Sequence, residues 1–515
     1  MTPSAEPATV PSRRRGTSSS WLPAGAGLLA TLIGVAGAWI PSFWWDEAAT
    51  VSAADRTVPE LGELLGRIDA VHGAYYLLMH GWFAVFGIGE LSARVPSALA
   101  VGIATAALVQ LARMLADTRV AVAAGAVFMV LPRITWAATE ARSYALVAAM
   151  GALTGLVLVT ALRSTRRWWW ALYAVLTALS VVLFFYSAAL VVAHAVTVAL
   201  SPARRRYRFL VAAAAAGAAV APFAALALSQ SGQVDWVPPL DHRIGETVAV
   251  DQWFPGATGF AALCLLLVIV GGVVGLYRGR RDGTAGDVLI VALPWLLVPI
   301  ALFLVYSLLV ANIYLGRYLI FTTPAVALLV GLAVGRTFTS RVAVAAVLLV
   351  LALVALPDYL EQRQPWGKPG GTDYSAAADE LARRARPGDC VAFQPTVTWQ
   401  PTSLRAIEQA RPDAFADLDD IGFGESGADL ASLWDTDAPT DVVAARARHC
   451  AVVWAVTDGD RATNARYLHP ANVWWEFAPF RFVDSDLYRA LAVEGFVISE
   501  RVPIHHTQLV RLERS

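Results

Sequence analysis

Long apolar stretches recur between residues 21 and 357, and they constrain the fold more than any other feature of this chain. A helix needs about 20 mainly apolar residues to cross about 30 Å of hydrocarbon, where its backbone must satisfy its own hydrogen bonds. Stretches that reach or approach this length are 21–40, 94–112, 119–138, 144–162, 168–186, 188–200, 209–229, 259–277, 287–310, 318–335 and 341–357. They predict a polytopic α-helical membrane protein with about 11 transmembrane helices.

The composition supports this class. Of the 515 residues, 57% are hydrophobic and 16% are charged, which is too apolar for an ordinary soluble fold. Acidic and basic residues balance at 40 each, so we expect no nucleic-acid partner, and the lipid bilayer is the expected surrounding. The first stretch follows Arg13 to Arg15 and is longer than the apolar core of a signal peptide, so we expect it to be retained.

Arginine residues gather at alternate connections between the predicted spans, which places the amino-terminal tail, residues 1–20, in the cytoplasm. The alternation holds only if the moderately apolar segment 72–86 stays on the outer side as a re-entrant or surface helix. The stretch 58–68 before it has leucines on one face, as an interfacial helix has. The basic connections contain Arg113 and Arg119; Arg163, Arg166 and Arg167; Arg204, Arg205, Arg206 and Arg208; Arg278, Arg280 and Arg281; and Arg336 and Arg341.

The composition changes near Asp358, where charged residues and turn formers become frequent. Residues 365–371 read Pro-Trp-Gly-Lys-Pro-Gly-Gly, which is typical of a linker. We therefore predict a membrane domain at 21–357 and an extracytoplasmic α/β domain at 358–515. In the second domain, helical spacing and short apolar strands alternate at 374–386, 390–393, 441–448 and 450–456.

Cys390 and Cys450 each open one of the two predicted strands of this domain. In an oxidising compartment they are able to form a disulfide, but two reduced and buried cysteines would have the same sequence pattern, so both states remain open. Cys264 lies inside an apolar run and is expected to be a small packing residue.

An adjacent acidic pair, Asp46 and Glu47, follows the first predicted span and two tryptophans. Carboxylates at the boundary of hydrocarbon and water are costly unless something uses them, so this pair indicates a functional site. The alternative is a solvated cap at the start of an interfacial helix, where acidic residues are common.

Several outward-facing segments together resemble one family of enzymes. Trp44 to Ala48 reads Trp-Trp-Asp-Glu-Ala, and His72 to Leu78 reads His-Gly-Ala-Tyr-Tyr-Leu-Leu. The others are Glu90 to Leu99, Glu140 to Leu146, and Leu315 to Leu319 with Pro324. They resemble GT-C membrane glycosyltransferases, and within these the family 39 branch of protein O-mannosyltransferases and lipid A aminoarabinose transferases. The resemblance covers roughly residues 40–325 and leaves the carboxyl-terminal domain unmatched.

The resemblance implies a transferase that takes a sugar from a polyprenyl-monophosphate donor and passes it, with inversion, to an acceptor at the outer face of the cell membrane. The acceptor would be a glycan, glycolipid or protein of the cell wall or envelope. Mannose is the first expectation for the sugar, and arabinofuranose or another pentose is the second. Such a reaction needs a carboxylate to bind or deprotonate the attacking hydroxyl, and cations to hold the departing phosphate.

The resemblance also implies roles for particular residues. Asp46 is the expected base or acceptor-positioning group, and Glu47 supports it through a hydrogen bond or at a metal. Arg142 and Arg317 are candidates for the donor phosphate, because a guanidinium offers bidentate geometry and stays charged near lipid. The candidate substrate-binding residues are His72, Glu140, Arg142, Tyr144, Asp235 and Arg317.

Two of these candidates have more specific expected roles. His72 would orient the acceptor or coordinate an ion. Asp235 lies in the polar and aromatic loop 230–239, which is long enough to cover the sugar as a lid. Family members differ in their need for a divalent cation, and this sequence has no ligand cluster of diagnostic spacing, so a metal cofactor stays open.

The chain departs from the family pattern at two places. His72 is followed by Gly73 and Ala74 where many relatives have two prolines. Ser143 and Tyr144 stand where many relatives have an aspartate a few residues beyond the loop arginine. The first departure loosens the backbone beside His72, and the second removes a metal ligand.

Each candidate also has a purely structural explanation. His72 is alternatively an interfacial packing residue, and Asp235 a turn residue. Glu140 and Arg142 alternatively pair with each other to staple their loop, and Arg317 anchors the end of a span. For the whole chain, the alternatives are a lipid or sugar transporter or flippase, and a scaffold or sensor that displays the soluble domain. A transporter is disfavoured because the sequence shows no repeated halves.

Overall fold

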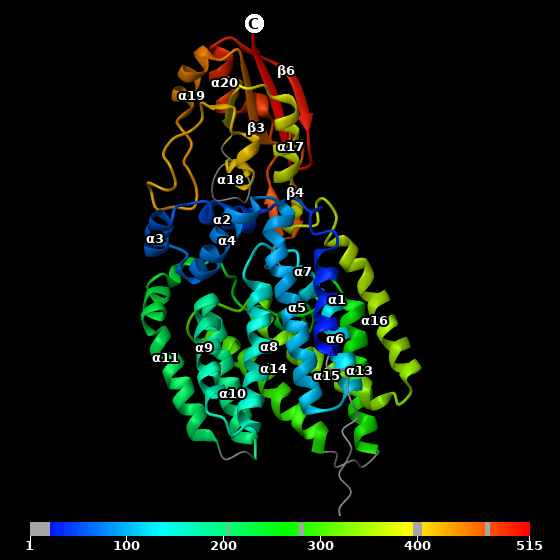
Figure 1. Cartoon of the computed structure of the whole chain (residues 1–515). Helices are drawn as coiled ribbons and strands as arrows, with labels where there is room; N and C mark the ends of the chain where they lie inside the picture. The colour runs from blue at the N-terminus through cyan, green and yellow to red at the C-terminus, as the bar shows by residue number, and fades with distance from the viewer. Residues whose placement is uncertain (1–20, 203–204, 278–282, 395–403, 469–473) are drawn as a thin grey trace, which may run out of the picture.

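The computed structural model describes residues 21–202, 205–277, 283–394, 404–468 and 474–515. Figure 1 shows long helices in the lower part, short helices in a middle layer, and a mixed α/β domain above them. The prediction of a helical membrane protein with a carboxyl-terminal α/β domain is confirmed. The middle layer consists of α2 (Trp45–Ala54), α3 (Val58–Arg67), the 3-10 helix η1 (Ala70–His72) and α4 (Gly73–Phe86).

Helices occupy all the predicted spans. Seven helices of the described residues are long and apolar enough to cross a membrane. They are α5 (Glu90–Leu115), α8 (Tyr144–Arg163), α11 (Arg206–Ser229), α13 (Thr258–Tyr277), α14 (Gly283–Leu309), η5 (Gly316–Thr322) continued by α15 (Thr323–Thr337), and α16 (Arg341–Glu361). Shorter apolar helices are α1 (Leu22–Val35), α6 (Thr118–Val130), α9 (Trp168–Leu183), and η2 (Phe185–Ala188) continued by α10 (Ala189–Leu200). The total of about 11 crossings stays a prediction.

The boundaries of three predicted spans were wrong. The span at 119–138 divides at Leu131 into α6 and α7 (Pro132–Ala137), because Pro132 has no backbone N–H to continue the first helix. The span at 318–335 starts as the 3-10 helix η5 and becomes an α-helix only at Thr323. The span at 21–40 is helical only as far as Val35.

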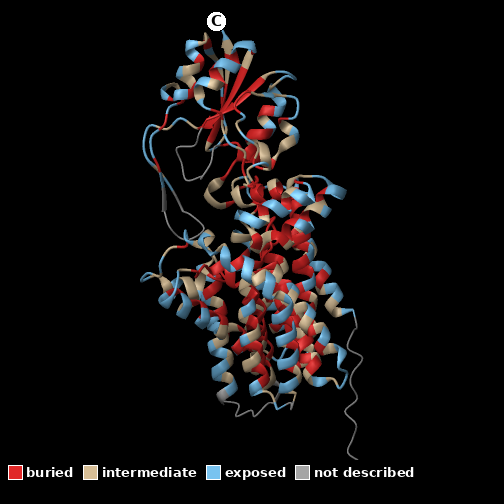
Figure 2. Cartoon of the chain, turned by 90° about the vertical axis from the view of Figure 1, so that its left-hand side faces the viewer, coloured by how far each residue is buried: buried red, intermediate tan, exposed pale blue. Residues whose placement is uncertain are grey.

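Small residues allow the lower helices to pack closely. A Cβ atom on Gly102 of α5 would lie 2.7 Å from the carbonyl oxygen of Gly27 of α1, so only a glycine fits at this crossing. Figure 2 shows buried residues along the inner faces of these helices and exposed residues on their outer faces. In a membrane protein the exposed apolar faces are the surface that meets lipid.

The middle layer combines a capped amphipathic helix with a half-buried one. Thr57 and Glu60 form a capping box at the start of α3. Leu61 and Leu64 on its apolar face are buried, as the sequence pattern predicts. The 14-residue α4 follows in the same layer, and its Tyr76 is buried. Between α11 and α13 the loop contains η3 (Ser231–Val234), α12 (Ile244–Glu246) and the π-helix η4 (Thr247–Asp251).

The carboxyl-terminal domain contains a mixed sheet with strand order β2-β1-β3-β7-β6. The strands are β1 (Cys390–Phe393), β2 (Asp419–Asp420), β3 (Val452–Asp458), β6 (Phe496–Pro503) and β7 (Thr507–Arg514). β1 is parallel to β2 and β3, whereas β7 is antiparallel to β3 and β6. β4 (Ala465–Leu468) and β5 (Trp474–Phe477) pair antiparallel in a separate two-stranded sheet. The helices are α17 (Tyr374–Arg384), α18 (Ala406–Ala410), α19 (Thr440–Arg446) and α20 (Asp486–Val493).

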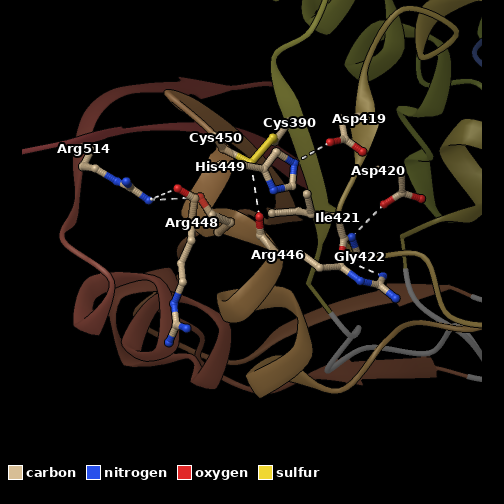
Figure 3. Close-up of a disulfide and its surroundings, with 11 residues drawn as sticks. Cys390, Asp419, Asp420, Ile421, Gly422, Arg446, Arg448, His449, Cys450 and Arg514 are labelled. Atoms are coloured by element: carbon tan, nitrogen blue, oxygen red, sulfur yellow. Dashed lines mark hydrogen bonds and ion pairs between the residues drawn. A yellow bond between two sulfur atoms is a disulfide. The ribbon is translucent and has the colours of Figure 1, made fainter.

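A disulfide joins Cys390 and Cys450, which resolves the two states left open by the sequence. The bond connects the first residue of β1 to the residue two positions before β3, and Figure 3 shows His449 and Asp419 beside it. Cys264 is buried and has a free thiol, as expected for a packing residue.

The segment predicted to be a linker, residues 365–371, is packed instead. Trp366 stacks on His505 with ring centroids 4.9 Å apart. The Pro365 carbonyl oxygen accepts a hydrogen bond from the Ser42 N–H at 3.0 Å. Lys368 is buried, because it pairs with carboxylates of the membrane part. The glycine and proline content of residues 365–371 therefore suggested a linker, but Lys368 pairs with buried carboxylates and holds the segment in place.

Candidate active site

Five separate segments meet between the membrane helices and the carboxyl-terminal domain. They are the first turn of α2, the middle-layer segment 69–76, the connection 138–143 between α7 and α8, the start of η5, and residues 365–371. The acidic pair Asp46 and Glu47 lies at their centre. Because successive residues of an α-helix point about 100° apart, the two carboxylates face different surroundings.

Glu47 lies in a fully buried ion-pair cluster. Arg94 donates from Nε and Nη2 to the two carboxylate oxygens of Glu47, at 2.9 and 2.6 Å. The Ala141 N–H donates to the same carboxylate at 2.9 Å. Arg94 also donates to the carbonyl oxygens of Ala38 and Ser42. The start of α2 is therefore fixed to α5 and to the chain that leads into it.

Lys368 completes this cluster together with Glu140. Its Nζ lies 2.6 Å from Glu140 Oε1 and 3.3 Å from Glu47 Oε1, and it also donates to the Thr139 carbonyl oxygen. The Trp44 indole N–H donates to the other oxygen of Glu140 at 3.0 Å. Burial raises the pKa of Glu140. Burial opposes ionisation of Glu47, but the attraction of Arg94 and Lys368 outweighs it and lowers its pKa.

Asp46 has a different environment from its neighbour. Its side chain keeps 19% of its surface exposed, and Oδ2 lies 3.8 Å from Nη2 of Arg317. Its backbone carbonyl oxygen accepts hydrogen bonds from Thr50 Oγ1 and, at 3.4 Å, from Arg142 Nη1. Asp46 is therefore an incompletely paired carboxylate beside two guanidinium groups.

Arg317 lies at the second residue of η5, and 8% of its side chain is exposed. The guanidinium carbon lies 5.9 Å from the ring centre of Tyr144, 5.6 Å from that of Trp236 and 5.9 Å from that of Tyr318. Its Nε and Nη1 atoms are buried and have no hydrogen-bond partner. A buried donor without a partner costs about 1–3 kcal/mol of folding free energy. These two N–H groups are therefore available to a hydrogen-bond acceptor from outside the chain.

Arg142 belongs to a hydrogen-bonded chain that includes His72. Arg142 Nη2 lies 3.0 Å from His72 Nε2, and Nη1 donates to the Tyr76 hydroxyl at 3.2 Å. The Tyr76 hydroxyl donates to Asp69 at 2.8 Å. Burial lowers the pKa of His72 well below its usual value, and the charges of Arg142 and Arg317 lower it further. A neutral His72 accepts the hydrogen bond from Arg142 at Nε2.

The loop after α11 covers one side of Arg317. Gln230 and Gln233 fix it to the middle layer, because their side-chain oxygens accept hydrogen bonds from the N–H groups of Ala70 and Asp69. Trp236 then lies over the Arg317 guanidinium. Asp235 is exposed. The described contacts do not join Asp235 to the other candidate residues.

A cavity of about 420 Å³ opens on another side of Arg317. Arg133, Trp136, Tyr314, Arg317 and Lys368 are among its lining residues, and acidic groups such as Asp358 line it as well. Arg133 packs over Trp136 with its guanidinium carbon 5.2 Å from the ring centre. Arg317 therefore lies beside both the cavity and the Asp46 carboxylate, whereas Asp46 is not among the lining residues.

The structure therefore separates the sequence candidates into three groups. Asp46, His72, Arg142, Tyr144 and Arg317 lie together. Glu47 and Glu140 form the buried cluster behind them, and Asp235 lies in the exposed part of the loop. The alternative in which Glu140 and Arg142 pair with each other was wrong, because Glu140 pairs with Lys368 and Trp44 while Arg142 contacts His72 and Tyr76.

Sequence reasoning missed Arg94, Lys368, Asp69 and Trp236. Two of them carried a usable signal. Arg94 is a charged residue at the start of a predicted span, where an unpaired charge would be costly. Lys368 is the only lysine of a chain that uses arginine everywhere else. Trp236 is the aromatic residue of the loop 230–239 that was predicted to be a lid, although no role was assigned to it, and Asp69 has no such signal.

The residues around Asp46 do not fit a divalent cation. Arginine nitrogens lie beside both Asp46 and His72, where a cation would need carboxylate or imidazole ligands. Among the described residues, Cys390, His449 and Cys450 form the one close group of three potential metal ligands, and the two cysteine sulfurs are bonded to each other.

Comparison with known proteins identifies the fold. No protein-family model and no curated protein matches the chain. The chain is similar to the crystal structure of ArnT from Cupriavidus metallidurans bound to undecaprenyl phosphate, with a TM-score of 0.56 and 14% identity over 96% of this chain and 98% of that one. The apo structure of the same ArnT gives 0.55 with the same identity and coverage. An oligosaccharyltransferase, AglB from Archaeoglobus fulgidus in complex with an inhibitory peptide and a dolichol-phosphate, gives 0.47 with 12% identity over 92% of this chain and 77% of that one. The ArnT likeness confirms the predicted GT-C fold.

Proposed function

We propose that this protein is an inverting glycosyltransferase that moves a sugar from a polyprenyl-phosphate donor to an acceptor on the extracytoplasmic side of the membrane. One observation carries the proposal. A buried arginine with two unpaired N–H groups lies 3.8 Å from a partly exposed aspartate. This is the pair of groups that transfer from a phosphate donor needs: donors for the leaving group and an acceptor for a proton.

We infer an in-line displacement in which Asp46 and Arg317 have separate roles. The hydroxyl oxygen of the acceptor attacks the anomeric carbon of the sugar, and its proton passes to the Asp46 carboxylate. The bond between the anomeric carbon and the phosphate oxygen breaks, and the electron pair stays on the departing polyprenyl phosphate. Arg317 receives the increased negative charge through Nε and Nη1. Attack opposite to the leaving group inverts the anomeric configuration.

The neighbouring groups support this assignment of roles. Arg142 adds a second guanidinium beside Asp46, where it donates a hydrogen bond to the Asp46 carbonyl oxygen. His72 is held neutral between Arg142 and Tyr76, so it acts as a hydrogen-bonding group that orients the acceptor. Trp236, over Arg317, provides an apolar cover that strengthens the interaction between the guanidinium and a phosphate.

The proposed lipid carrier and the proposed sugar are supported by different observations. The ArnT structure with this fold contains undecaprenyl phosphate, which favours a polyprenyl carrier here. Mannose is the first candidate for the sugar and arabinofuranose or another pentose the second, both from the family resemblance. The acceptor is a glycan, glycolipid or protein of the cell envelope.

Transfer by the purified protein in lipid vesicles tests the proposal. Polyprenyl-phosphate mannose and a pentosyl donor are supplied separately with envelope acceptors, and the glycosylated product is measured by mass spectrometry. We expect product with one donor, and none from Asp46→Ala inserted at the wild-type level. Movement of labelled lipid or sugar that survives Asp46→Ala would instead support a transporter.

Reporter fusions test the orientation on which the proposal depends. We expect the connection between α1 and α2 and the carboxyl terminus to lie outside, as the alternation of basic connections predicts. A cytoplasmic location of the connection before Trp45 would place the site on the opposite side of the membrane from the donor sugar. It would contradict the proposal.

A further inference from the structure

We propose that the carboxyl-terminal domain is a positioning element of the active site, which holds α2 and therefore Asp46 through Lys368 and through residues 430–434, here called the docking loop. The inference rests on the proposed function in one respect, which is that Asp46 acts as the base. It adds a role for a domain that the family resemblance leaves without one.

The docking loop follows α2 along its length. Trp434 packs against Trp45, the residue before Asp46, with ring centroids 4.1 Å apart. Ser52, two turns further along α2, donates from its hydroxyl to the Leu433 carbonyl oxygen. Arg56, just beyond the end of α2, donates to the Ser432 carbonyl oxygen. The loop therefore contacts both ends of the helix that carries Asp46.

The docking loop is itself held in one conformation. The Ser432 N–H donates to the Gly427 carbonyl oxygen at 2.8 Å, and the Gly427 N–H donates to Asp435 at 2.6 Å. A Cβ atom on Gly427 would lie 2.7 Å from the backbone of Trp434, so the close approach requires glycine. Trp434 is 9% exposed. Because the docking loop is fixed within its domain, the position of Trp45 depends on the position of that domain.

A second connection reaches the other side of α2. Lys368, in the chain that leads from α16 into the domain, inserts between Glu47 and Glu140. With Arg94 it balances the two buried carboxylates, so loss of Lys368 leaves one buried negative charge without a counterion. Ser375 of α17 adds a reciprocal pair of hydrogen bonds with Ser42 and Phe43, just before α2.

The two connections act on Asp46 from opposite directions. Lys368 acts through Glu47, which follows Asp46, and Trp434 acts through Trp45, which precedes it. A rotation of α2 about its axis would change the 3.8 Å separation of Asp46 and Arg317. Since misplacement by about 1 Å can cost about 100-fold in rate, the domain sets the catalytic geometry without touching the substrate.

The first experiment measures α2 directly and needs no activity. Hydrogen exchange of the peptide that covers residues 45–54 is compared in the wild-type protein, in Trp434→Ala and in the control Val493→Ala, which changes an exposed residue of the same domain. We expect faster exchange only in Trp434→Ala. Unchanged exchange would overturn the proposal. If Trp434→Ala does not insert, Arg56→Gln removes a contact of the docking loop without a large cavity and gives the same comparison.

The second experiment uses charge compensation. Lys368→Met is expected to lower kcat at least about tenfold with KM for the donor within about twofold, because Asp46 moves while the donor groups stay. The double variant Lys368→Met and Glu140→Gln restores charge balance, and we expect it to recover most of the lost kcat. No recovery, or a change in donor KM alone, would contradict a positioning role for Lys368.

The two proposals fail in different ways. If the wild-type protein transfers no sugar from any polyprenyl-phosphate donor, the proposed function is wrong, while faster exchange of α2 in Trp434→Ala still supports the domain as a support for this helix. If transfer occurs and both α2 exchange and kcat are unaffected by Trp434→Ala and Lys368→Met, the proposed function stands and the positioning role is wrong.

Discussion

Glu47 and Asp46 are neighbours on one helical turn, yet their surroundings differ in how completely their charges are paired. Glu47 has no exposed surface and meets Arg94, Lys368 and a backbone N–H. Asp46 is partly exposed and has one loosely placed cation, Arg317, which itself has two unpaired N–H groups. A saturated cluster holds structure in place, whereas an incompletely paired one has capacity left for a substrate.

The comparison predicts its largest effect at Asp46. Asp46→Asn keeps the shape of the side chain but cannot accept a proton, so we expect kcat to fall by about 10²–10⁴-fold. Donor affinity and thermal stability should stay near wild type, because Asp46 is partly exposed and its single ion pair, with Arg317, is long at 3.8 Å. Single-turnover kinetics with donor binding measured in parallel check this. A loss of donor affinity with normal kcat would assign Asp46 to binding.

Substitution of Glu47, whose charge is fully paired, should mainly lower the stability of the folded protein. Glu47→Gln leaves Arg94 and Lys368 facing a single carboxylate, and breaking a buried pair costs about 3–5 kcal/mol. We therefore expect a lower melting temperature and poor insertion, and in the remaining folded protein a kcat about tenfold lower, as in Lys368→Met, because Asp46 moves with Glu47. Thermal unfolding in detergent measures the first effect and activity per folded molecule the second. Normal stability with lost turnover would exchange the roles of the two residues.

Arg317 should determine donor affinity. Arg317→Gln removes the charge and most of the unpaired donors, and we expect KM for the donor to rise by about 10–100-fold, which corresponds to one or two charge-assisted hydrogen bonds. Arg113→Gln, at a cytoplasmic connection in the predicted topology, is the matched control and should leave KM unchanged. A fall in kcat with unaltered KM would show that Arg317 acts only on the transition state.

The smallest expected effect is a pH dependence of stability from His72. Its pKa in the folded protein lies well below the value of about 6.5 in the unfolded chain. Below pH 6.5 the unfolded chain binds a proton that the folded protein does not, so stability falls as pH decreases, by up to about 1.4 kcal/mol per pH unit. His72→Gln should remove this slope between pH 6.5 and 5. An unchanged slope would mean that His72 is not held neutral.

Much of the membrane part follows from hydropathy, because a bilayer requires long apolar helices. The boundaries fail where one residue changes backbone chemistry, as Pro132 does. In the soluble domain, β1 and β3 are predictable as short apolar runs. The strands β6 and β7 were not predicted, although the alternation of inward and outward positions along β6 is typical of a half-buried antiparallel strand.

The candidate site shows the same division. Asp46, Arg142 and Arg317 are recognisable because each is a charged residue near the end of a predicted span and lies in a family motif. The partners of Glu47 are not recognisable as partners, since Arg94 and Lys368 lie 47 and 321 positions away in the sequence. Only the folded chain brings them together. The glycine- and proline-rich neighbours of Lys368 predicted a linker, although Lys368 is buried.

The central claim is that the unpaired N–H groups of Arg317 hold a donor phosphate within reach of Asp46. A structure of the protein with a polyprenyl monophosphate tests it most directly. We expect phosphate oxygens within hydrogen-bonding distance of Arg317 Nε and Nη1, on the side that faces Asp46. A phosphate bound elsewhere, with both of these N–H groups still unpaired, would contradict it.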